Sequence, residues 1–145
     1  MGRLQTMDKL IRQGFQGSIT CKLCNNHPES HEHLFFECHY SATIWKAINE
    51  KVRTTWPVQP WNQLLQWASS KFKKKQDITH SIPKLILSTT IYHLWHERNN
   101  RCFNAQYRSM HSISEDIYQL IRLHLNGMKK KVTFPSAIRL DWGIG

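Results

Sequence analysis

Four side chains of the kinds that bind zinc lie within eighteen residues of one another. They are Cys21, Cys24, His33 and Cys38, with the spacing C-x2-C-x8-H-x4-C. Thiolate sulfur and imidazole nitrogen are usual ligands of tetrahedral Zn²⁺, which does no redox chemistry. The C-x2-C pair can form a tight turn with both sulfurs on one side, and His33 and Cys38 lie about one and a half helical turns apart. The spacing therefore predicts one small zinc knuckle.

The histidine ligand has an alternative, because His27, His31, His33 and His39 all lie close to the cysteines in the sequence. His33 gives the x8 and x4 spacings of the array, so it is the first choice for the fourth ligand. His31 is the second choice.

The array predicts a structural site and not a catalytic one. A catalytic zinc keeps a position open for water, whereas four good ligands are present here. The sequence contains neither H-E-x-x-H nor the deaminase pattern of H-x-E followed by P-C-x-x-C. The remaining thiol, Cys102, is expected to be a small buried hydrophobic residue. We therefore expect a protein that is not an enzyme and that takes no small-molecule substrate.

The site must be positioned by helices. Thr6 can cap a first helix and Gly14 can follow its end, and Ser30 can cap a helical turn that presents His33. Pro83 suits the first turn of a long helix, where a missing N–H costs least. Helices are expected over residues 3–13, 31–37, 41–52, 61–72, 82–103 and 112–127.

The sequence thus predicts a mainly α fold, in which a small zinc knuckle is followed by a loose bundle of three or four helices. Four segments are expected: a helix plus zinc-binding module over 1–53, a Pro-rich linker over 54–60, a helical region over 61–131 and a loosely packed tail over 132–145. A knuckle of this size lacks a core of its own, so residues 1–50 are expected to be disordered without metal.

The charge balance indicates a polyanionic partner. The chain has 20 Lys and Arg against 10 Asp and Glu, a formal net charge of +10, and a pI of about 9.7. Such a field favours polyanionic partners, nucleic acid first and an anionic membrane surface second. No run of eighteen apolar residues and no secretory signal is present, so we expect an intracellular protein of the nucleus or cytoplasm that does not enter membranes. The candidate nucleic-acid contacts are Lys22, Lys46, Lys73, Lys74, Lys75, Arg98 and Arg101.

The wider motif around the cysteines resembles a known family. T-x-D-x-L-x-x-x-G begins at Thr6, C-x-L-C at Cys21 and E-S-x-x-H-L-F-F-E-C at Glu29, and I-W follows at Ile44. Together these residues are similar to the zinc-binding domain found beside reverse transcriptases, the CCHC-type domain that follows the polymerase in non-LTR, LINE-type retrotransposons of plants. The run LWHERNNRCFN, residues 94–104, is similar to a W-x-x-R-N-x-x-x-F segment further along in that family.

The resemblance implies a module that grips RNA or target DNA for a polymerase, so RNA or single-stranded DNA is the expected ligand. The chain carries no polymerase motif and no Trp-containing helix ahead of Thr6, so it resembles a detached or truncated fragment of such an element. The absent helix motivates an alternative, a protein-interaction adaptor that docks on a host protein through an exposed apolar face near Trp45.

Overall fold

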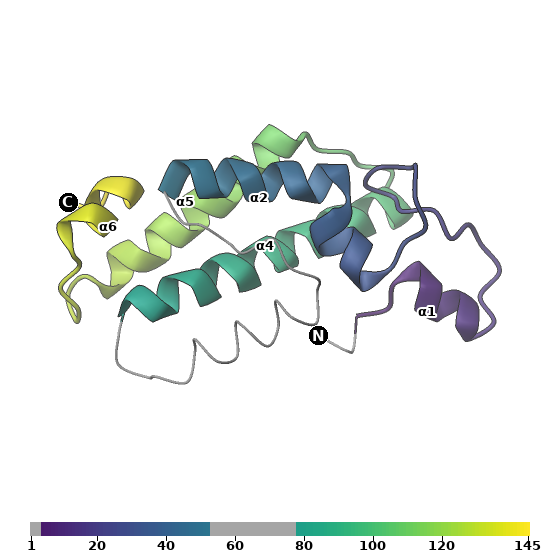
Figure 1. The fold of residues 1–145 in the computed structure, drawn as a ribbon, viewed down its shortest axis with the longest axis horizontal. Helices are drawn as coiled ribbons and strands as arrows, with labels where there is room; N and C mark the ends of the chain where they lie inside the picture. Colours follow the sequence, from purple (N-terminus) through teal and green to yellow (C-terminus); the bar gives the residue numbers. More distant parts are fainter. Residues whose placement is uncertain (1–3, 53–77) are drawn as a thin grey trace.

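The computed structural model of the protein describes residues 4–52 and 78–145, and over these residues it is mainly helical (Figure 1). The predicted linker and the predicted helix over 61–72 lie outside the described residues. Within the described ranges, the sole β pairing is an isolated bridge between Thr20 and Pro28. The elements are α1 (Met7–Arg12), the π-helix η1 (His33–Glu37), α2 (His39–Val52), α4 (Ile78–Phe103), α5 (Met110–Met128) and α6 (Ser136–Trp142). The predicted fold class is confirmed.

Three long helices, α2, α4 and α5, lie along the length of the molecule in Figure 1, with α1 at one end and α6 at the other. α5 packs against both α2 and α4, and η1 packs against α2 and α4. The segment that carries the cysteines therefore rests on the same helices that form the rest of the bundle.

The hydrophobic core is continuous from the cysteine segment to the C-terminal residues. It begins at Cys21 and Cys38, runs through Ile44 and Ile117, and reaches Trp142 near the C-terminus. Each fully buried aliphatic side chain in such a core contributes about 1.5–3 kcal/mol of transfer free energy. The helices that follow the cysteine region thus share one core with it.

The starts of four helices differ from the sequence expectation: α1 begins at Met7 where residue 3 was expected, and α2 begins at His39 where residue 41 was expected. α4 begins at Ile78, so Pro83 lies in its second turn and not its first, at the loss of one backbone hydrogen bond. α5 begins at Met110, because the hydroxyl of Ser109 accepts a hydrogen bond from the amide of Ser112 and caps the helix. Ser109, Ser112 and Ser114 can all cap a helix by residue type, so the sequence alone does not show which of them begins this one.

The C-terminal segment is packed and not loose, contrary to the expectation. Trp142 is 1% exposed, and its ring stacks on Tyr118 with 5.1 Å between centroids. Arg122 of α5 donates hydrogen bonds to the carbonyls of Trp142 (3.1 Å) and Gly143 (3.3 Å). Gly143 takes a left-handed conformation, with φ of 58°, and ends α6. The helical periodicity of α5 did not indicate that Tyr118 packs against Trp142, because Trp142 lies in a separate short helix.

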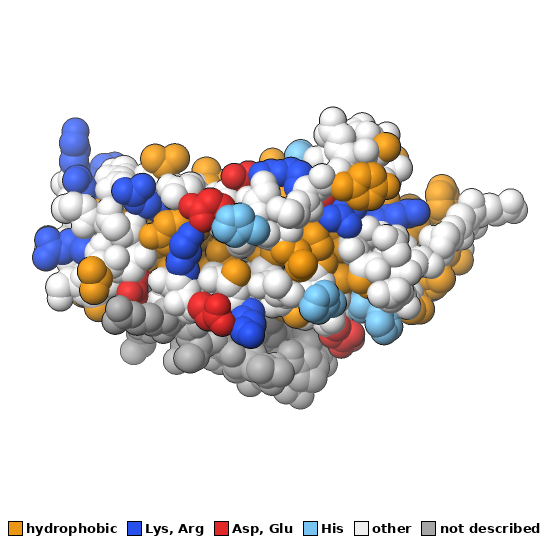
Figure 2. Space-filling view, turned by 90° about the horizontal axis from the view of Figure 1, so that it is seen from above, with side chains coloured by type: hydrophobic (Ala, Val, Ile, Leu, Met, Phe, Trp, Pro, Cys, Tyr) orange, Lys and Arg blue, Asp and Glu red, His pale blue; other side chains and the backbone are white. Residues whose placement is uncertain are grey.

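The described surface mixes charges of both signs with apolar side chains. Figure 2 shows the face that is uppermost in Figure 1, with Lys and Arg frequent at the end where α6 lies. We call residues 128–144 the basic end, and residues 21–38 together with residues 97–101 of α4 the metal end. None of the helices in the described ranges is both long and apolar enough to cross a bilayer.

Candidate metal centre

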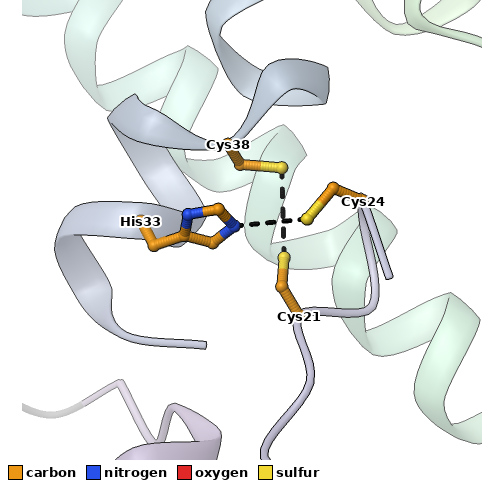
Figure 3. Close-up of side chains that lie close together, drawn as sticks. All are labelled: Cys21, Cys24, His33 and Cys38. Carbon is orange, nitrogen blue, oxygen red and sulfur yellow. Dashed lines mark hydrogen bonds between the residues drawn. The ribbon is translucent and has the colours of Figure 1, made fainter. Parts of the chain in front are cut away.

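The structure brings Cys21, Cys24, His33 and Cys38 together. Their ligand atoms all lie within 4.8 Å of one another, and Figure 3 shows the four side chains pointing toward a common centre. The Sγ atoms of Cys21 and Cys38 are 3.9 Å apart, and Sγ of Cys24 is 3.3 Å from Nε2 of His33. Two sulfurs bound to one tetrahedral zinc at the usual bond length lie about 3.8 Å apart. The donor set and its spacing therefore fit a Zn²⁺ ion.

The two N-terminal cysteines sit on a closed turn. The amide of Cys21 donates to the carbonyl of His27 (2.8 Å), and the amide of Asn25 donates back to the carbonyl of Cys21 (2.8 Å). Asn25 has a φ of 57°, a left-handed conformation that asparagine tolerates better than most residues. The amide of Asn26 also donates to the sulfur of Cys24, at 3.5 Å. This turn places both sulfurs on one side of the backbone.

A π-helix places the other two ligands. The amide of Cys38 donates to the carbonyl of His33, five residues earlier, at 2.7 Å. Five residues of an α-helix would turn the two side chains about 140° apart, whereas the wider π turn brings them to one side. The hydroxyl of Ser30 accepts from the amide of His33 (3.1 Å) and so begins the turn. The predicted cap by Ser30 is confirmed, whereas the π geometry was not foreseen from the x4 spacing.

The alternative ligand, His31, lies outside the cluster. Its Nε2 is 2.8 Å from the carbonyl oxygen of Leu4, and its ring faces Phe35 with 6.1 Å between centroids. His27 lies nearer, with its ring centroid 5.2 Å from that of His33. Of these histidines, the one grouped with the three sulfurs is His33.

The protonation chemistry of the cluster suits metal binding. Burial, together with the neighbouring His27, lowers the pKa of His33 and favours the neutral imidazole that binds a metal. The hydrogen bond between Cys21 and Cys38, together with burial, raises the pKa of the Cys21 thiol, while the same hydrogen bond lowers the pKa of Cys38. A divalent cation would displace the shared proton, since the thiolate is the form that binds.

Helix α2 holds the π-helix in place through side-chain hydrogen bonds to its backbone carbonyls. Nε1 of Trp45 donates to the carbonyl of Phe35 at 2.6 Å, and the hydroxyl of Ser41 donates to the carbonyl of Leu34. Trp45 is 9% exposed, and Phe36 stacks on it with 5.6 Å between centroids. The expected apolar face near Trp45 is therefore covered, because the chain itself packs there.

Arg98 is not available as a nucleic-acid contact, which corrects the sequence expectation. Its side chain is 2% exposed, and its Nη2 lies 2.6 Å from Oε1 of Glu29, which is fully buried. Arg101 is also internal, with 10% of its side chain exposed and its Nε 2.8 Å from Oε1 of Glu97. A guanidinium held by a buried carboxylate cannot also reach a phosphate in solution. No local pattern marks the first pair, since Glu29 and Arg98 lie 69 residues apart, whereas Glu97 and Arg101 stand at the i, i+4 spacing of a helix.

The remaining candidate contacts are distributed differently. Lys22 is half-buried in the cysteine turn, and Lys46 is exposed on α2, with its Nζ 3.9 Å from a carboxylate oxygen of Glu50. The other three, Lys73, Lys74 and Lys75, lie outside the described residues.

The geometry defines a candidate zinc centre of the Cys₃His type within a helical protein. Residues 1–45 match the family described as zinc-binding in reverse transcriptase, which confirms the resemblance drawn from the motif. The match contains all four candidate ligands and ends at Trp45 within α2, so it does not include α4, α5 or α6. No catalytic domain is evident in the 145 residues. Comparisons with curated proteins and with solved structures gave no significant match.

Proposed function

We propose that the protein is a non-enzymatic zinc-binding protein that holds one structural Zn²⁺ through Cys21, Cys24, His33 and Cys38, and that it binds RNA or single-stranded DNA. The convergence of these four side chains within 4.8 Å carries the zinc proposal. Three thiolates and an imidazole fill the coordination shell of Zn²⁺ and leave no position for a reacting water. The metal would therefore hold the fold together and not activate a substrate.

The basic end supports the nucleic-acid proposal. Its four exposed cations are Lys129, Lys130, Lys131 and Arg139. Among the described residues, none of the four forms an ion pair with a carboxylate, whereas Arg98, Arg101 and Arg108 all do. Unpaired surface cations contact phosphates without sequence choice, and such contacts make binding strongly dependent on salt. The basic surface therefore lies away from the two arginines of α4 that the sequence suggested.

The test is fluorescence anisotropy of a labelled oligouridine and of its DNA counterpart, measured at several salt concentrations. We expect the Lys129→Ala, Lys130→Ala, Lys131→Ala triple variant to bind more weakly, with a salt slope lower by about 2, since each lost phosphate contact on a single strand contributes about 0.7. Lys51→Ala is the control, because Lys51 is already paired with Glu115 at 2.5 Å. Binding that ignores salt, or an unchanged slope in the triple variant, would contradict the proposal.

A protein partner is the second candidate function, and exposed leucines favour it. Leu120 and Leu123 share one face of α5 and are 49% and 66% exposed, and Leu140 of α6 is 70% exposed. An adaptor would dock through such apolar side chains and would resist high salt. Recovery of one stoichiometric protein after nuclease treatment, with loss of that protein in Leu123→Asp, would favour the adaptor over nucleic-acid binding.

A further inference from the structure

The carbonyls of the cysteine turn are held by a helix almost eighty residues away in the sequence. Nη1 of Arg101 donates to the carbonyl oxygens of Lys22 (3.3 Å) and Leu23 (3.1 Å), which are the two residues between Cys21 and Cys24. The planar guanidinium carries five donors in a fixed fork, so one side chain can serve several acceptors. These contacts fix the part of the backbone that sets the separation of the two sulfurs.

The guanidinium of Arg101 is itself held in place by several other contacts. Its Nε donates to Glu97 at 2.8 Å, and its Nη2 donates to the carbonyl of Arg108 at 3.1 Å. The guanidinium also lies over the ring of Tyr40, 4.6 Å from the centroid, and Tyr40 follows Cys38 by two residues. An arginine held in this way loses little further freedom when it holds the turn, so its contacts act as a rigid support.

Arg98 supports the segment between the two pairs of ligands. It donates to both carboxylate oxygens of Glu29, from Nη2 at 2.6 Å and from Nε at 3.1 Å. Glu29 directly precedes Ser30, whose hydroxyl caps the turn that presents His33. The same carboxylate accepts the amide of Met7 at 2.8 Å, which ties α1 to this point. Each pair of ligands thus has its own arginine from one turn of α4.

We propose that Arg98 and Arg101 are positioning residues of the metal centre, so that the zinc affinity of residues 21–38 depends on α4. This inference rests on the proposed zinc binding and extends the binding unit beyond the matched residues 1–45. Neither arginine binds the metal; each holds the backbone from which the ligands project. Loss of such outer hydrogen bonds in zinc sites commonly lowers metal affinity by about 10–100-fold.

The test compares zinc affinities of the full chain by competition with a chromophoric chelator. The variants are Arg101→Lys and Arg98→Lys, which keep the positive charge for Glu97 and Glu29 but lose the fork. The matched control is Arg122→Lys, because Arg122 also donates to two backbone carbonyls, those of Trp142 and Gly143, but at the basic end. We expect about a tenfold loss of zinc affinity in Arg101→Lys and no loss in Arg122→Lys.

Two results would overturn the inference: unchanged affinity in Arg101→Lys, or an equal fall in Arg101→Lys and Arg122→Lys, which would indicate general destabilisation. If Arg98→Lys fails to fold, Arg101→Lys decides the question, because its side chain is the less deeply buried of the two. The ligand-field spectrum of bound Co²⁺ provides a second readout, since a displaced turn changes the geometry around the metal. A wild-type chain that takes up no zinc would refute the zinc proposal itself, and the wild-type measurement alone separates that failure from this one.

Discussion

The metal end and the basic end of the shared core differ in whether charged side chains are buried beside the apolar ones. At the metal end, charged side chains are buried: Glu29 is fully buried, and Glu97 and Arg98 are 1% and 2% exposed. At the basic end, the buried groups are mainly apolar, with Trp142 and Ile144 at 1% and 5% exposed, while the charges lie outside in solvent. The metal end therefore adds directional hydrogen bonds and converging ligands to its share of the apolar core, whereas the basic end depends mainly on apolar area.

This difference determines how substitutions at each end change the stability of the protein. Buried ion pairs contribute little net stability over an apolar alternative, but removing one partner is costly, because the other charge stays buried and alone. Apolar contacts are lost gradually, in proportion to the atoms removed. We therefore expect substitutions at the metal end to have all-or-none effects, and those at the basic end to have graded effects.

The largest effect should come from loss of the metal. Removal of zinc by a chelator, or Cys24→Ser, should abolish metal binding and unfold residues 21–38, since zinc contributes on the order of 10 kcal/mol to folding in small zinc domains. Metal content by mass spectrometry and the near-ultraviolet circular dichroism of Trp45 measure the two effects. Hydrogen exchange should show Ile117 and Ile121 of α5 better protected than Cys38. Equal loss of protection at Ile117, Ile121 and Cys38 would contradict this expectation.

The next effect concerns the buried pair. Glu29→Gln leaves the guanidinium of Arg98 buried without a charged partner, so we expect a loss of about 3–5 kcal/mol in the free energy of unfolding. Asp116→Asn is the control, because Asp116 pairs with Arg108 at a similar 2.6 Å but with both side chains at least 40% exposed. That exposed pair should contribute less than about 1 kcal/mol. Denaturant unfolding of the zinc-loaded proteins gives both values, and similar losses in the two variants would show that burial does not govern these pairs.

A cavity in the bundle should have a smaller effect that leaves the metal in place. Ile117 is fully buried, and Ile117→Ala should lower the free energy of unfolding by about 3 kcal/mol. Leu123→Ala on the same helix should change it by less than about 0.5 kcal/mol, because Leu123 is 66% exposed. Zinc content should stay at the wild-type value in both variants. Loss of zinc from Ile117→Ala would show that metal binding depends on the packing of α5 in the core.

The smallest effects should come from two glycines, Gly143 in the basic end and Gly127 just before it, with opposite signs. Gly143→Ala should destabilise the protein by about 1–2 kcal/mol, because an L side chain is strained at its φ of 58°. Gly127→Ala should stabilise it by about 0.5–1 kcal/mol, since Gly127 lies within α5 and an added Cβ meets nothing within 4 Å. Thermal unfolding midpoints measure both, and shifts of the same sign would contradict the assignment of these two conformations.

The sequence alone predicted the parts of the structure that depend on local spacing. The four candidate ligands were identified because C-x2-C and H-x4-C are short patterns, and α2 was predicted because Ile44, Trp45, Ile48 and Val52 repeat at helical spacing. Gly14, with a φ of 95°, lies just after α1 where its helix-ending role placed it. Assignment of the four side chains as zinc ligands remains a prediction until metal binding is measured.

The parts that the sequence did not predict depend on contacts between distant residues. A single sequence shows that Arg98 and Arg101 are basic, and basic residues are usually exposed, so they were assigned to a nucleic-acid surface. Their burial follows from Glu29 and from the carbonyls of Lys22 and Leu23, none of which is near α4 in sequence. The packing of Trp142 against Tyr118 was missed for the same reason, because neither residue marks its partner.

The separation of Glu29 from Arg98 by 69 residues also sets an order of events during synthesis. A ribosome adds about 5–20 residues per second, so roughly 3–14 s pass between the making of this carboxylate and the making of its arginine. All four candidate ligands are therefore made well before the helix that holds their backbone. A nascent chain would first meet zinc as a weak, exchangeable binder and would retain it firmly only once α4 has emerged and docked.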